Sequence, residues 1–166
     1  MNVLETSRLK LRRLVPEDAE VLFRTAGNAD VMRFWAPGPD QNSDQTCARI
    51  NAINEHWNTH GFGDWALIEK GKDVLIGFCG LHYIAGMNEV NIGYAIEKSK
   101  WGLGFGAEIV KKILEIGFHQ LGLKKIVAVI DPNNELSLKL IRKCGFTYWK
   151  DSSYMGRPRV VYKIGI

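Results

Sequence analysis

The sequence predicts a mixed α+β domain whose sheet is mainly antiparallel, with about seven strands and about four helices. Apolar residues alternate with charged ones near the start of the chain, as in a half-buried strand. Residues 64–97 hold two apolar runs joined by a turn at 70–73 and then a third strand pattern, EVNIGYAI, which is typical of an antiparallel meander. Only one strand-loop-helix-strand unit follows, so a doubly wound parallel sheet is excluded.

The first strand and the first two helices are predicted from the spacing of apolar residues and from the residues that start and stop helices. Residues 8–14 alternate leucines with charged residues, which predicts a strand, and residues 15–27 open with a proline and acids and stop at a glycine, which predicts a helix. Residues 42–61 carry apolar side chains at spacings of three and four, with Ser43 or Asp44 as the candidate cap. This segment is predicted to be a second helix that ends at its final glycine.

The later elements are equally regular. Residues 64–97 predict three antiparallel strands with a first turn at 70–73, and a long helix with one polar stripe follows the glycine-rich segment. Residues 124–131 are almost continuously β-branched, as in a strand buried on both faces. Residues 132–146 then read as a capped helix, and residues 147–164 as two closing strands around a Gly and Pro turn.

Composition bounds the class of protein. At 166 residues, with 46% hydrophobic and 24% charged residues, the chain is predicted to form one domain, residues 1–166. The segment MNVLETSRLKLRRL is charged where a signal peptide needs an apolar run, and no apolar run reaches about 18 residues. We therefore expect a cytoplasmic protein without a membrane partner.

The charge and the cysteine and histidine spacing limit which ligands, partners and metals are expected. The net charge of +4 suits an anionic ligand, but the 22 Lys and Arg residues are spread along the chain without a nucleic-acid-binding motif, which argues against nucleic acid. Cys47, Cys79 and Cys144 form no C-x-x-C pair, so neither a disulfide framework nor a cysteine zinc site is expected. His56 and His60 have helical zinc-ligand spacing but no glutamate between them, and we predict no metal.

A glycine cluster opens the long helix. In KSKWGLGFGAEIVKKIL, residues 98–114, Gly102, Gly104 and Gly106 directly precede the helical pattern. Such a start leaves backbone N–H groups unpaired at the positive end of the helix and lets a ligand approach closely, which favours a phosphate. The alternative, a tight turn without a ligand, would weaken the fold for no local gain.

A dinucleotide site is the competing interpretation of this cluster. Gly102, Gly104 and Ala107 satisfy G-x-G-x-x-G/A, and Asp131 ends the next strand where a ribose-binding acid would stand. The preceding strand, however, ends near Ile96, with five residues before Gly102, whereas a dinucleotide turn needs glycine directly at the strand's end. A nicotinamide-dependent oxidoreductase is therefore the third choice of function.

The ordered segments LIGFCGLHYI, NEVNIGYAI and KWGLGFGAEIVKKILEIGFHQLGLKKIVAVIDPNNELSLKLIRKCGF resemble the GNAT N-acetyltransferases, in particular the Rim-type branch that acetylates ribosomal-protein N-termini. The resemblance covers nearly the whole chain, including ETSRLKLRRLVPEDA at its start. It implies the GNAT fold, acetyl-CoA as the acetyl donor and an amine acceptor. Many relatives pair as homodimers, but the oligomeric state of this chain is left open by the sequence.

The resemblance also implies which residues bind the cofactor. The family's loop, Q/R-x-x-G-x-G/A, maps onto Trp101, Gly104 and Gly106, with Trp101 departing from the Q/R form. The end of the NIGYAI strand would pair through its backbone with the pantetheine amides. Asn134 would bind the cofactor through its side chain, although it also fits a helix cap. The implied cofactor-binding residues are Tyr94, Ala95, Ile96, Trp101, Gly102, Leu103, Gly104, Phe105, Gly106, Ala107, Asn134 and Ser137.

Two catalytic residues are expected, Glu89 and Ser137. The resemblance gives Ser137 a hydrogen bond to the sulfur or a proton for the leaving thiolate, the alternative being a helix-end hydrogen bond. Many relatives carry a tyrosine four positions later, where this chain has Ile141.

The amine must lose a proton before it attacks. Glu89 begins the strand that borders the thioester and is the predicted base, acting through water, although it also fits a surface acid. The branch often has Glu at the position of Asn91, and Asp64 and Glu69 are the alternative bases.

The sequence therefore predicts an N-acetyltransferase that moves the acetyl group from acetyl-CoA to a primary amine, a protein N-terminus or a small molecule, by direct transfer. The alternative is a non-catalytic acyl-CoA-binding or regulatory module, because the acid before IGY and the helix tyrosine are missing. The acceptor would be shaped by loops 35–41 and 151–159, where Arg157 and Arg159 favour an acidic character.

Overall fold

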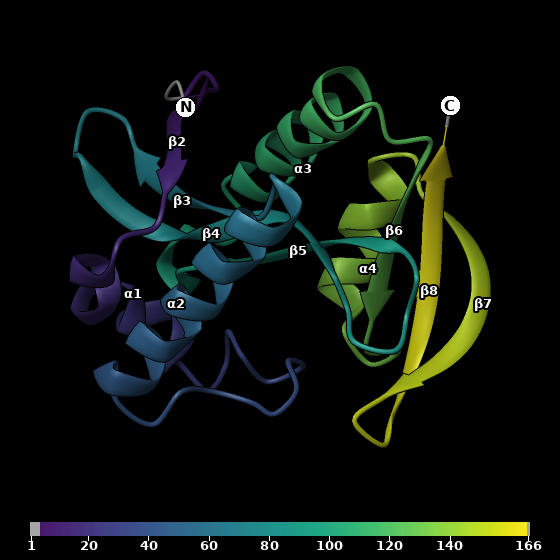
Figure 1. Cartoon of the computed structure of the whole chain (residues 1–166), viewed down its shortest axis with the longest axis horizontal. Helices are drawn as coiled ribbons and strands as arrows, with labels where there is room; N and C mark the ends of the chain where they lie inside the picture. The colour runs from purple at the N-terminus through teal and green to yellow at the C-terminus, as the bar shows by residue number, and fades with distance from the viewer. Residues whose placement is uncertain (1–3, 166) are drawn as a thin grey trace.

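A computed structural model describes residues 4–165 as a mixed sheet of eight strands with helices on both faces (Figure 1). The order across the sheet is β1-β2-β3-β4-β5-β6-β8-β7, and every neighbouring pair is antiparallel except β5 and β6. The predicted fold class is confirmed, with the short β1 as the additional strand. The strands are β1 Leu4–Glu5, β2 Leu9–Arg13, β3 Asp64–Glu69, β4 Val74–Tyr83, β5 Val90–Ile96, β6 Lys125–Ile130, β7 Thr147–Tyr154 and β8 Arg157–Gly165.

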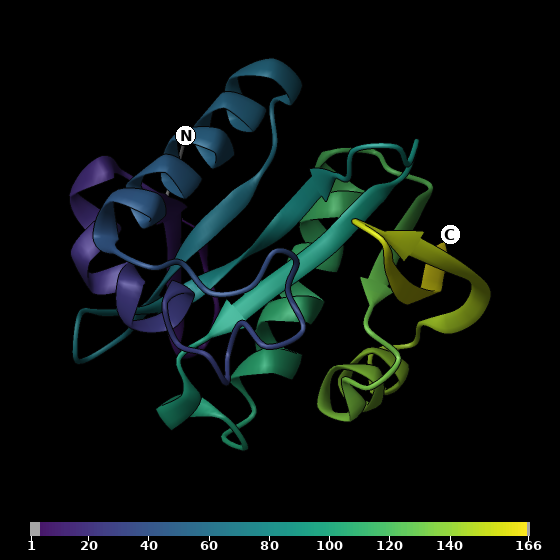
Figure 2. The same ribbon diagram turned by 90° about the horizontal axis from the view of Figure 1, so that it is seen from below.

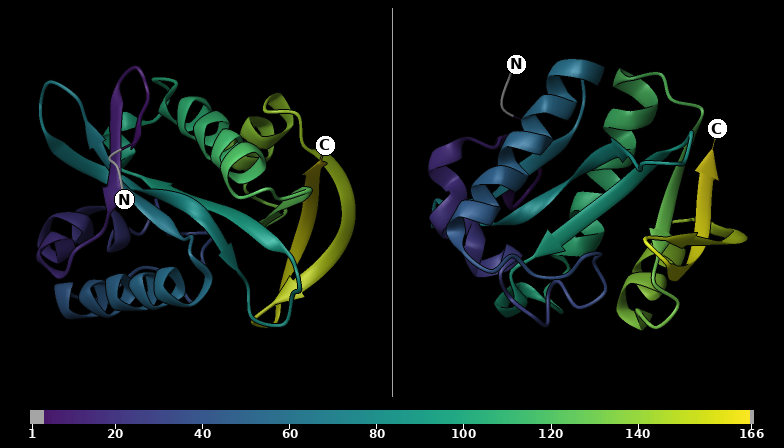
Figure 3. Two further views of the ribbon diagram at one scale, coloured as in Figure 1. Left: turned by 45° about the horizontal axis from the view of Figure 1, so that its top comes forward. Right: turned by 60° about the horizontal axis from the view of Figure 1, so that its bottom comes forward.

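The helices sit in two layers. Figure 3 shows α1 and α2 on one face of the sheet and α3 and α4 on the other. Within the described residues no helix is long and apolar enough to cross a membrane. The four helices of residues 4–165 are α1 Ala19–Ala26, α2 Ser43–His60, α3 Phe105–Glu115, which continues as a π-helical turn over Ile116–Gln120, and α4 Glu135–Lys143.

The cap of α2 differs from the prediction. Asn42, rather than Ser43 or Asp44, is the N-cap, because its backbone is extended and its side chain accepts a hydrogen bond from the Gln45 N–H. The predicted stop at Gly61 is confirmed, since this residue is left-handed with φ 77° and bonds back to the carbonyl of Trp57.

Alternation along the strands separates two cores. Phe78 and Ala66 pack beneath α1 and α2 with Leu22, whereas their chain neighbours Cys79 and Leu67 belong to the cluster beneath α3. The larger of these buried side chains, such as Phe78 and Leu67, each contribute about 1.5–3 kcal/mol to stability. Because successive residues of a strand face opposite layers, functional side chains on one strand are also divided between the two faces.

Strands β5 and β6 diverge from a single point of contact. The only residue pair in their register is Asn91 with Val127, and beyond it the strands separate, as Figure 2 shows. The side-chain Oδ1 of Asn91 accepts the N–H of Val129 at 2.9 Å, so it takes the place of a backbone partner where the ladder ends. The divergence opens the sheet in the middle, between its two faces.

Candidate active site

A cavity of about 1160 Å³ lies where β5 and β6 diverge. It is lined by the end of β5, the turn that opens α3, the start of α4, and the loop between α1 and α2. The residues predicted to bind the cofactor line this cavity with one exception, Leu103. The members that line it are Tyr94, Ala95, Ile96, Trp101, Gly102, Gly104, Phe105, Gly106, Ala107, Asn134 and Ser137.

The glycine turn presents backbone N–H groups to the cavity. Gly102 and Gly104 adopt left-handed φ angles of 73° and 84°, which favour glycine over any residue with a side chain. Gly104 is the N-cap of α3 and no side chain caps the helix, whose first backbone bond runs from the Glu108 N–H to the Gly104 carbonyl. The N–H groups of the first turn are therefore left to an anion, at the positive end of the helix.

Gly106 has a different role in the same turn. A Cβ at Gly106 would lie 2.9 Å from Cδ2 of Leu140, so the absent side chain lets α4 pack closely against the start of α3. This contact places the two helix N-termini on the same cavity, because Gly106, Asn134 and Ser137 all line it.

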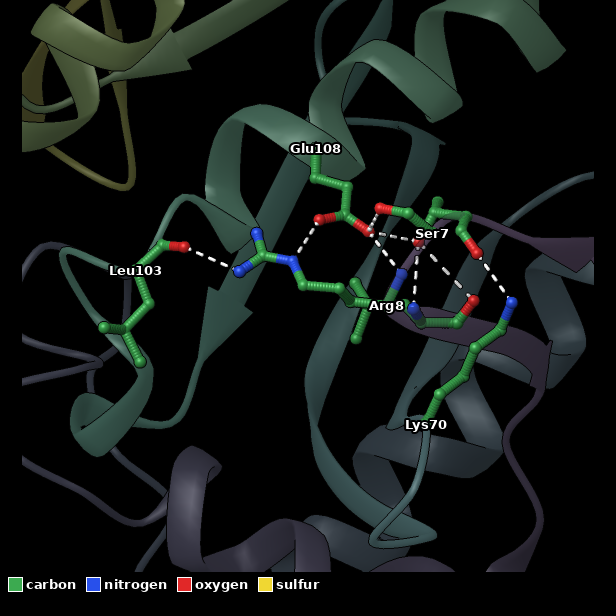
Figure 4. Close-up of polar contacts among 7 residues, drawn as sticks. Ser7, Arg8, Lys70, Leu103 and Glu108 are labelled. Atoms are coloured by element: carbon green, nitrogen blue, oxygen red, sulfur yellow. Dashed lines mark hydrogen bonds and ion pairs between the residues drawn. The ribbon is translucent and has the colours of Figure 1, made fainter.

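The β1–β2 turn holds this loop from outside (Figure 4). Glu108, in the first turn of α3, accepts hydrogen bonds from Thr6 Oγ1, Ser7 Oγ and both the backbone N–H and Nε of Arg8. Burial alone would raise the pKa of Glu108, but the bonds from Thr6 and Arg8 lower it below its usual value. Lys70 fixes the same turn by donating to the Thr6 carbonyl at 2.7 Å.

Arg8 extends this cluster to the glycine turn itself. Its Nη1 donates to the Leu103 carbonyl at 2.8 Å, and its guanidinium lies 4.1 Å from the centre of the Phe105 ring. Leu103 lies outside the cavity lining with its side chain exposed to solvent, and only its carbonyl is held by Arg8. Sequence patterns gave no signal for this contact, because Arg8 and Leu103 are 95 residues apart.

Trp101 ties the turn to β5. Its Nε1 donates to the Ile96 carbonyl at 2.9 Å, which explains a tryptophan at this position of the loop. The Glu97 N–H donates to the Ile76 carbonyl of β4. In an antiparallel pair, every second residue turns its N–H and C=O toward the partner strand, so Tyr94 and Ile96 turn theirs away from β4. The backbone edge of Tyr94 therefore faces the gap left by β6.

A hydroxyl pair spans the cavity between β5 and α4. The hydroxyls of Tyr94 and Ser137 are hydrogen-bonded to each other, and burial raises the pKa of Tyr94 well above its usual value. Asn134 caps α4 by accepting the Ser137 N–H at 3.2 Å, which leaves its own amide N–H groups free for another partner. The Tyr94 side chain was not foreseen, because only its backbone had an expected role.

Three polar side chains form a chain on the other face of the sheet. Asp64 Oδ1 lies 3.3 Å from His82 Nδ1, and Asn91 Nδ2 lies 3.2 Å from His82 Nε2. Since Asn91 Oδ1 accepts from the Val129 N–H, its amide must donate to Nε2, so the neutral ring carries its proton on Nδ1 and donates it to Asp64.

The hydrogen bonds to Asp64 and Asn91 make His82 a proton acceptor, and the pKa of this residue is raised. Burial alone lowers the pKa of His82, but the negative charge and hydrogen bond of Asp64 outweigh burial and raise it above its ordinary value. The sequence analysis missed His82. One signal could have found it. His82 lies four residues after Phe78 on β4, so alternation places this polar side chain on the same buried face of the strand.

The predicted base, Glu89, is not brought to the cavity. It lies outside the lining, and its Oε1 accepts from Lys125 Nζ at 2.7 Å. Glu69 is likewise outside the lining and pairs with Lys100 at 2.6 Å. Of the three carboxylates considered as base, the structure places only Asp64 on the cavity.

One of the two helical histidines, His56, is engaged by the protein through both ring nitrogens. His56 Nδ1 donates to the Phe62 carbonyl at 2.8 Å, and its Nε2 accepts the Tyr83 N–H at 3.1 Å, so both ring nitrogens are engaged. Burial lowers the pKa of His56, in keeping with a neutral ring. This histidine joins α2 to the end of β4.

Comparison with known proteins identifies the family. The acetyltransferase (GNAT) domain matches residues 8–147, which is most of the chain. The chain belongs to the GNAT acetyltransferase family. It is 32% identical to the uncharacterised N-acetyltransferase YoaA of Bacillus subtilis over 145 residues, 87% of this chain and 82% of that protein.

Two further acetyltransferases are similar to this chain, one in sequence and one in fold. A spermidine N(1)-acetyltransferase of Vibrio cholerae is 27% identical over 146 residues, which cover 84% of this chain and 79% of that one. The fold also matches the ribosomal-protein-S5-alanine acetyltransferase from Vibrio fischeri, with a TM-score of 0.80 at 16% identity over 99% of this chain and 97% of the other.

As a GNAT protein the chain is an acyltransferase that uses acetyl-CoA as acyl donor. The cavity suits this donor in two places. The uncapped N–H groups at the start of α3 match a diphosphate, and the free backbone edge of Tyr94 matches the amides of a pantetheine arm.

Proposed function

We propose that this chain transfers the acetyl group of acetyl-CoA directly to a primary amine while both are bound. The observation that carries the proposal is the placement of two proton-handling groups on opposite faces of β5. His82 lies with Asp64 and Asn91 on the face that α1 and α2 cover, whereas Tyr94 meets Ser137 of α4 on the other face. A thioester held between them would have a base on one side and a hydroxyl donor on the other.

The donor is bound by backbone groups more than by charged side chains. The N–H groups around Gly104, Phe105 and Gly106 hold the diphosphate, with the α3 dipole favouring its negative charge. The backbone of Tyr94 adds the pantetheine arm to the edge of β5 as though it were a further strand. Asn134 keeps its cap and donates one amide N–H to the same arm.

His82 removes the proton from the attacking amine. Its Nε2 is the ring's acceptor atom, and Asp64 holds the ring in the required tautomer and stabilises the imidazolium that forms. The amide of Asn91 rests against Nε2 and would be displaced by the amine or by a bridging water. Asp64 is therefore a positioning residue, and Glu89, paired with Lys125, takes no part in this scheme.

Ser137 acts on the leaving group. When Tyr94 donates its hydroxyl proton to Ser137 Oγ, the Ser137 hydroxyl is free to donate to the sulfur of the departing thiolate. Because burial raises the pKa of Tyr94, this pair retains its protons and stabilises the thiolate by hydrogen bonding. The thiolate is then protonated by solvent as the product leaves.

The proposal also includes the branch of the family, the location of the protein, its oligomeric state and its acceptor. Membership of the Rim-type branch is supported by the fold of ribosomal-protein acetyltransferases and by the opening segment ETSRLKLRRLVPEDA, and a cytoplasmic location and a homodimer stay predictions. The relatives together name a polyamine and a ribosomal protein as acceptors, so the shared chemistry is a primary amine.

The proposal is tested by the release of free CoA thiol. Acetyl-CoA is mixed with the protein and with each member of a panel of primary amines, and thiol is followed with a chromogenic disulfide. We expect thiol release that depends on the amine, with acetylated amine formed in equal amount. Saturable binding of acetyl-CoA without release for any amine would contradict transfer and support the non-catalytic acyl-CoA-binding module.

A further inference from the structure

We infer that the acceptor is a small monoamine with an aromatic or other apolar body, and that a polyamine is a poor substrate. The inference rests on the proposed transfer to an amine and adds the class of that amine. It comes from the half of the cavity that faces α1 and α2, where His82 lies.

Apolar side chains line this half of the cavity. Trp35, from the α1–α2 loop, packs its ring edge against Phe78 of β4 with 5.6 Å between ring centres. The same half receives Ile53 from α2 and Phe34 from the loop. An acceptor bound here would bury its body among aromatic and aliphatic groups, which stabilises an apolar substituent and leaves a charged one without water.

Trp35 reaches the place where the reaction is proposed to occur. A Cβ built on Gly93 would lie 2.7 Å from Cε1 of His82 and 3.5 Å from Cη2 of Trp35. The base and the indole therefore both lie over Gly93, where the His82 ring takes the place that a side chain of this residue would occupy. An amine at His82 would place its first carbon atoms directly against the six-membered ring of Trp35.

The charges of the lining match one ammonium group. Asp30 pairs with Lys98 at 2.6 Å, and Asp131 pairs with Arg159 at 3.0 Å, so these carboxylates are already neutralised. Among residues 4–165, the side chain of Asp64 has only the neutral His82 ring as an ionic partner. Glu135, the remaining lining carboxylate, is at the start of α4 on the opposite face.

A second ammonium on the acceptor would therefore have no partner on this face. Leaving it desolvated and unpaired costs far more than losing one apolar contact. Arg33, which also lines the cavity beside Phe34, adds a positive charge that repels a polycation. A monoamine avoids both penalties.

Two arginine side chains of β8 bond to the backbone of the α1–α2 loop. Arg157 Nη1 donates to the Trp35 carbonyl and Arg159 Nη2 to the Phe34 carbonyl, each at 3.3 Å. These bonds tie the α1–α2 loop to β8 across the gap between β5 and β6, which favours a small molecule over a folded protein. Arg159 is paired with Asp131, whereas Arg157 donates only to a neutral carbonyl, so the acidic acceptor suggested by these arginines stays a prediction.

The test compares amines at saturating acetyl-CoA. The probes are 2-phenylethylamine, spermidine and a tetrapeptide with an N-terminal phenylalanine, and kcat/KM is measured by thiol release. We expect kcat/KM for 2-phenylethylamine to exceed that for spermidine by at least about 10-fold. Equal or better use of spermidine, or a clear preference for the peptide, would overturn the inference while leaving the proposed transfer intact. A panel in which no amine releases thiol would overturn both.

A variant separates the role of the indole from general damage. Trp35→Ala is expected to raise KM for 2-phenylethylamine about 10-fold and to raise KM for ethylamine by a much smaller factor. Trp149→Ala, outside the lining on β7, is the matched control and should leave both values unchanged. The melting temperature and the Kd for acetyl-CoA check that each variant is folded. Equal effects of Trp35→Ala on both amines would contradict the inference.

Discussion

His82→Gln is expected to lower kcat about 10²- to 10⁴-fold while changing the Kd for acetyl-CoA by no more than about 2-fold. Glutamine keeps a hydrogen-bonding side chain near Asp64 and Asn91, so the cavity retains its shape, but it cannot accept the proton of the amine. The loss should therefore fall on the chemical step. Single-turnover acetyl transfer, measured at saturating amine, reports this step without product release.

The pH profile identifies the base more specifically. Only the neutral ring of His82 accepts a proton, so kcat of the wild type should rise as pH increases through the pKa of His82 and then level off. Because Asp64 raises this pKa, the rise should be centred above about 6.5, the ordinary value for histidine. Asp64→Asn removes the raising charge and should move the rise to lower pH.

The control is a histidine that the account leaves without a role. His60→Gln changes an exposed residue at the end of α2 and should keep both kcat and the pH profile. If His82→Gln retains the wild-type kcat and the same rise with pH, the proton acceptor lies elsewhere and the assignment of His82 is wrong.

Gly104→Val is expected to raise the Kd for acetyl-CoA at least about 10-fold. A β-branched residue strongly disfavours the φ of 84° at this N-cap, so the turn must change conformation. The N–H groups at the start of α3 then no longer point toward the diphosphate. The new Cβ would also lie 3.3 Å from Nη2 of Arg8, which holds the turn through Leu103.

Gly71→Val is the matched control for this change. Gly71 has φ 83° in the β3–β4 turn, with open space around its Cβ position, so the backbone strain is the same. Both variants should lose about 1–3 kcal/mol of unfolding free energy in urea titrations. Titration calorimetry with acetyl-CoA should then show weaker binding for Gly104→Val alone, and equal Kd values for the two variants would show that the turn does not contact the donor.

Much of the fold could be predicted because its signals are local. The apolar spacing of residues 42–61 and the glycine at 61 predicted α2 within one residue at each end, and strand alternation predicted the β3–β5 meander. The cap of α2 was misassigned because Asn42, Ser43 and Asp44 are all good caps, and only the backbone conformation chooses among them.

The catalytic face could not be predicted, because it depends on pairing between distant segments. His82 meets Asp64 and Asn91 only through the register of β3, β4 and β5, and no local pattern separates it from a structural histidine. Glu89 was favoured by its position before β5, but the parallel start of β6 brings Lys125 to it instead. The resemblance to GNAT proteins supplied the donor site, where backbone groups matter more than side chains.

The most direct test of the account is a calorimetric comparison of three ligands, namely CoA, 3′-dephospho-CoA and pantetheine. If the amides at the start of α3 hold the diphosphate, 3′-dephospho-CoA should bind within a few fold of CoA, since it keeps the diphosphate. Pantetheine, which lacks it, should bind about 100-fold more weakly, the equivalent of one or two hydrogen bonds to a charged group. Pantetheine that binds as tightly as CoA, or a chain that binds none of the three, would contradict the account.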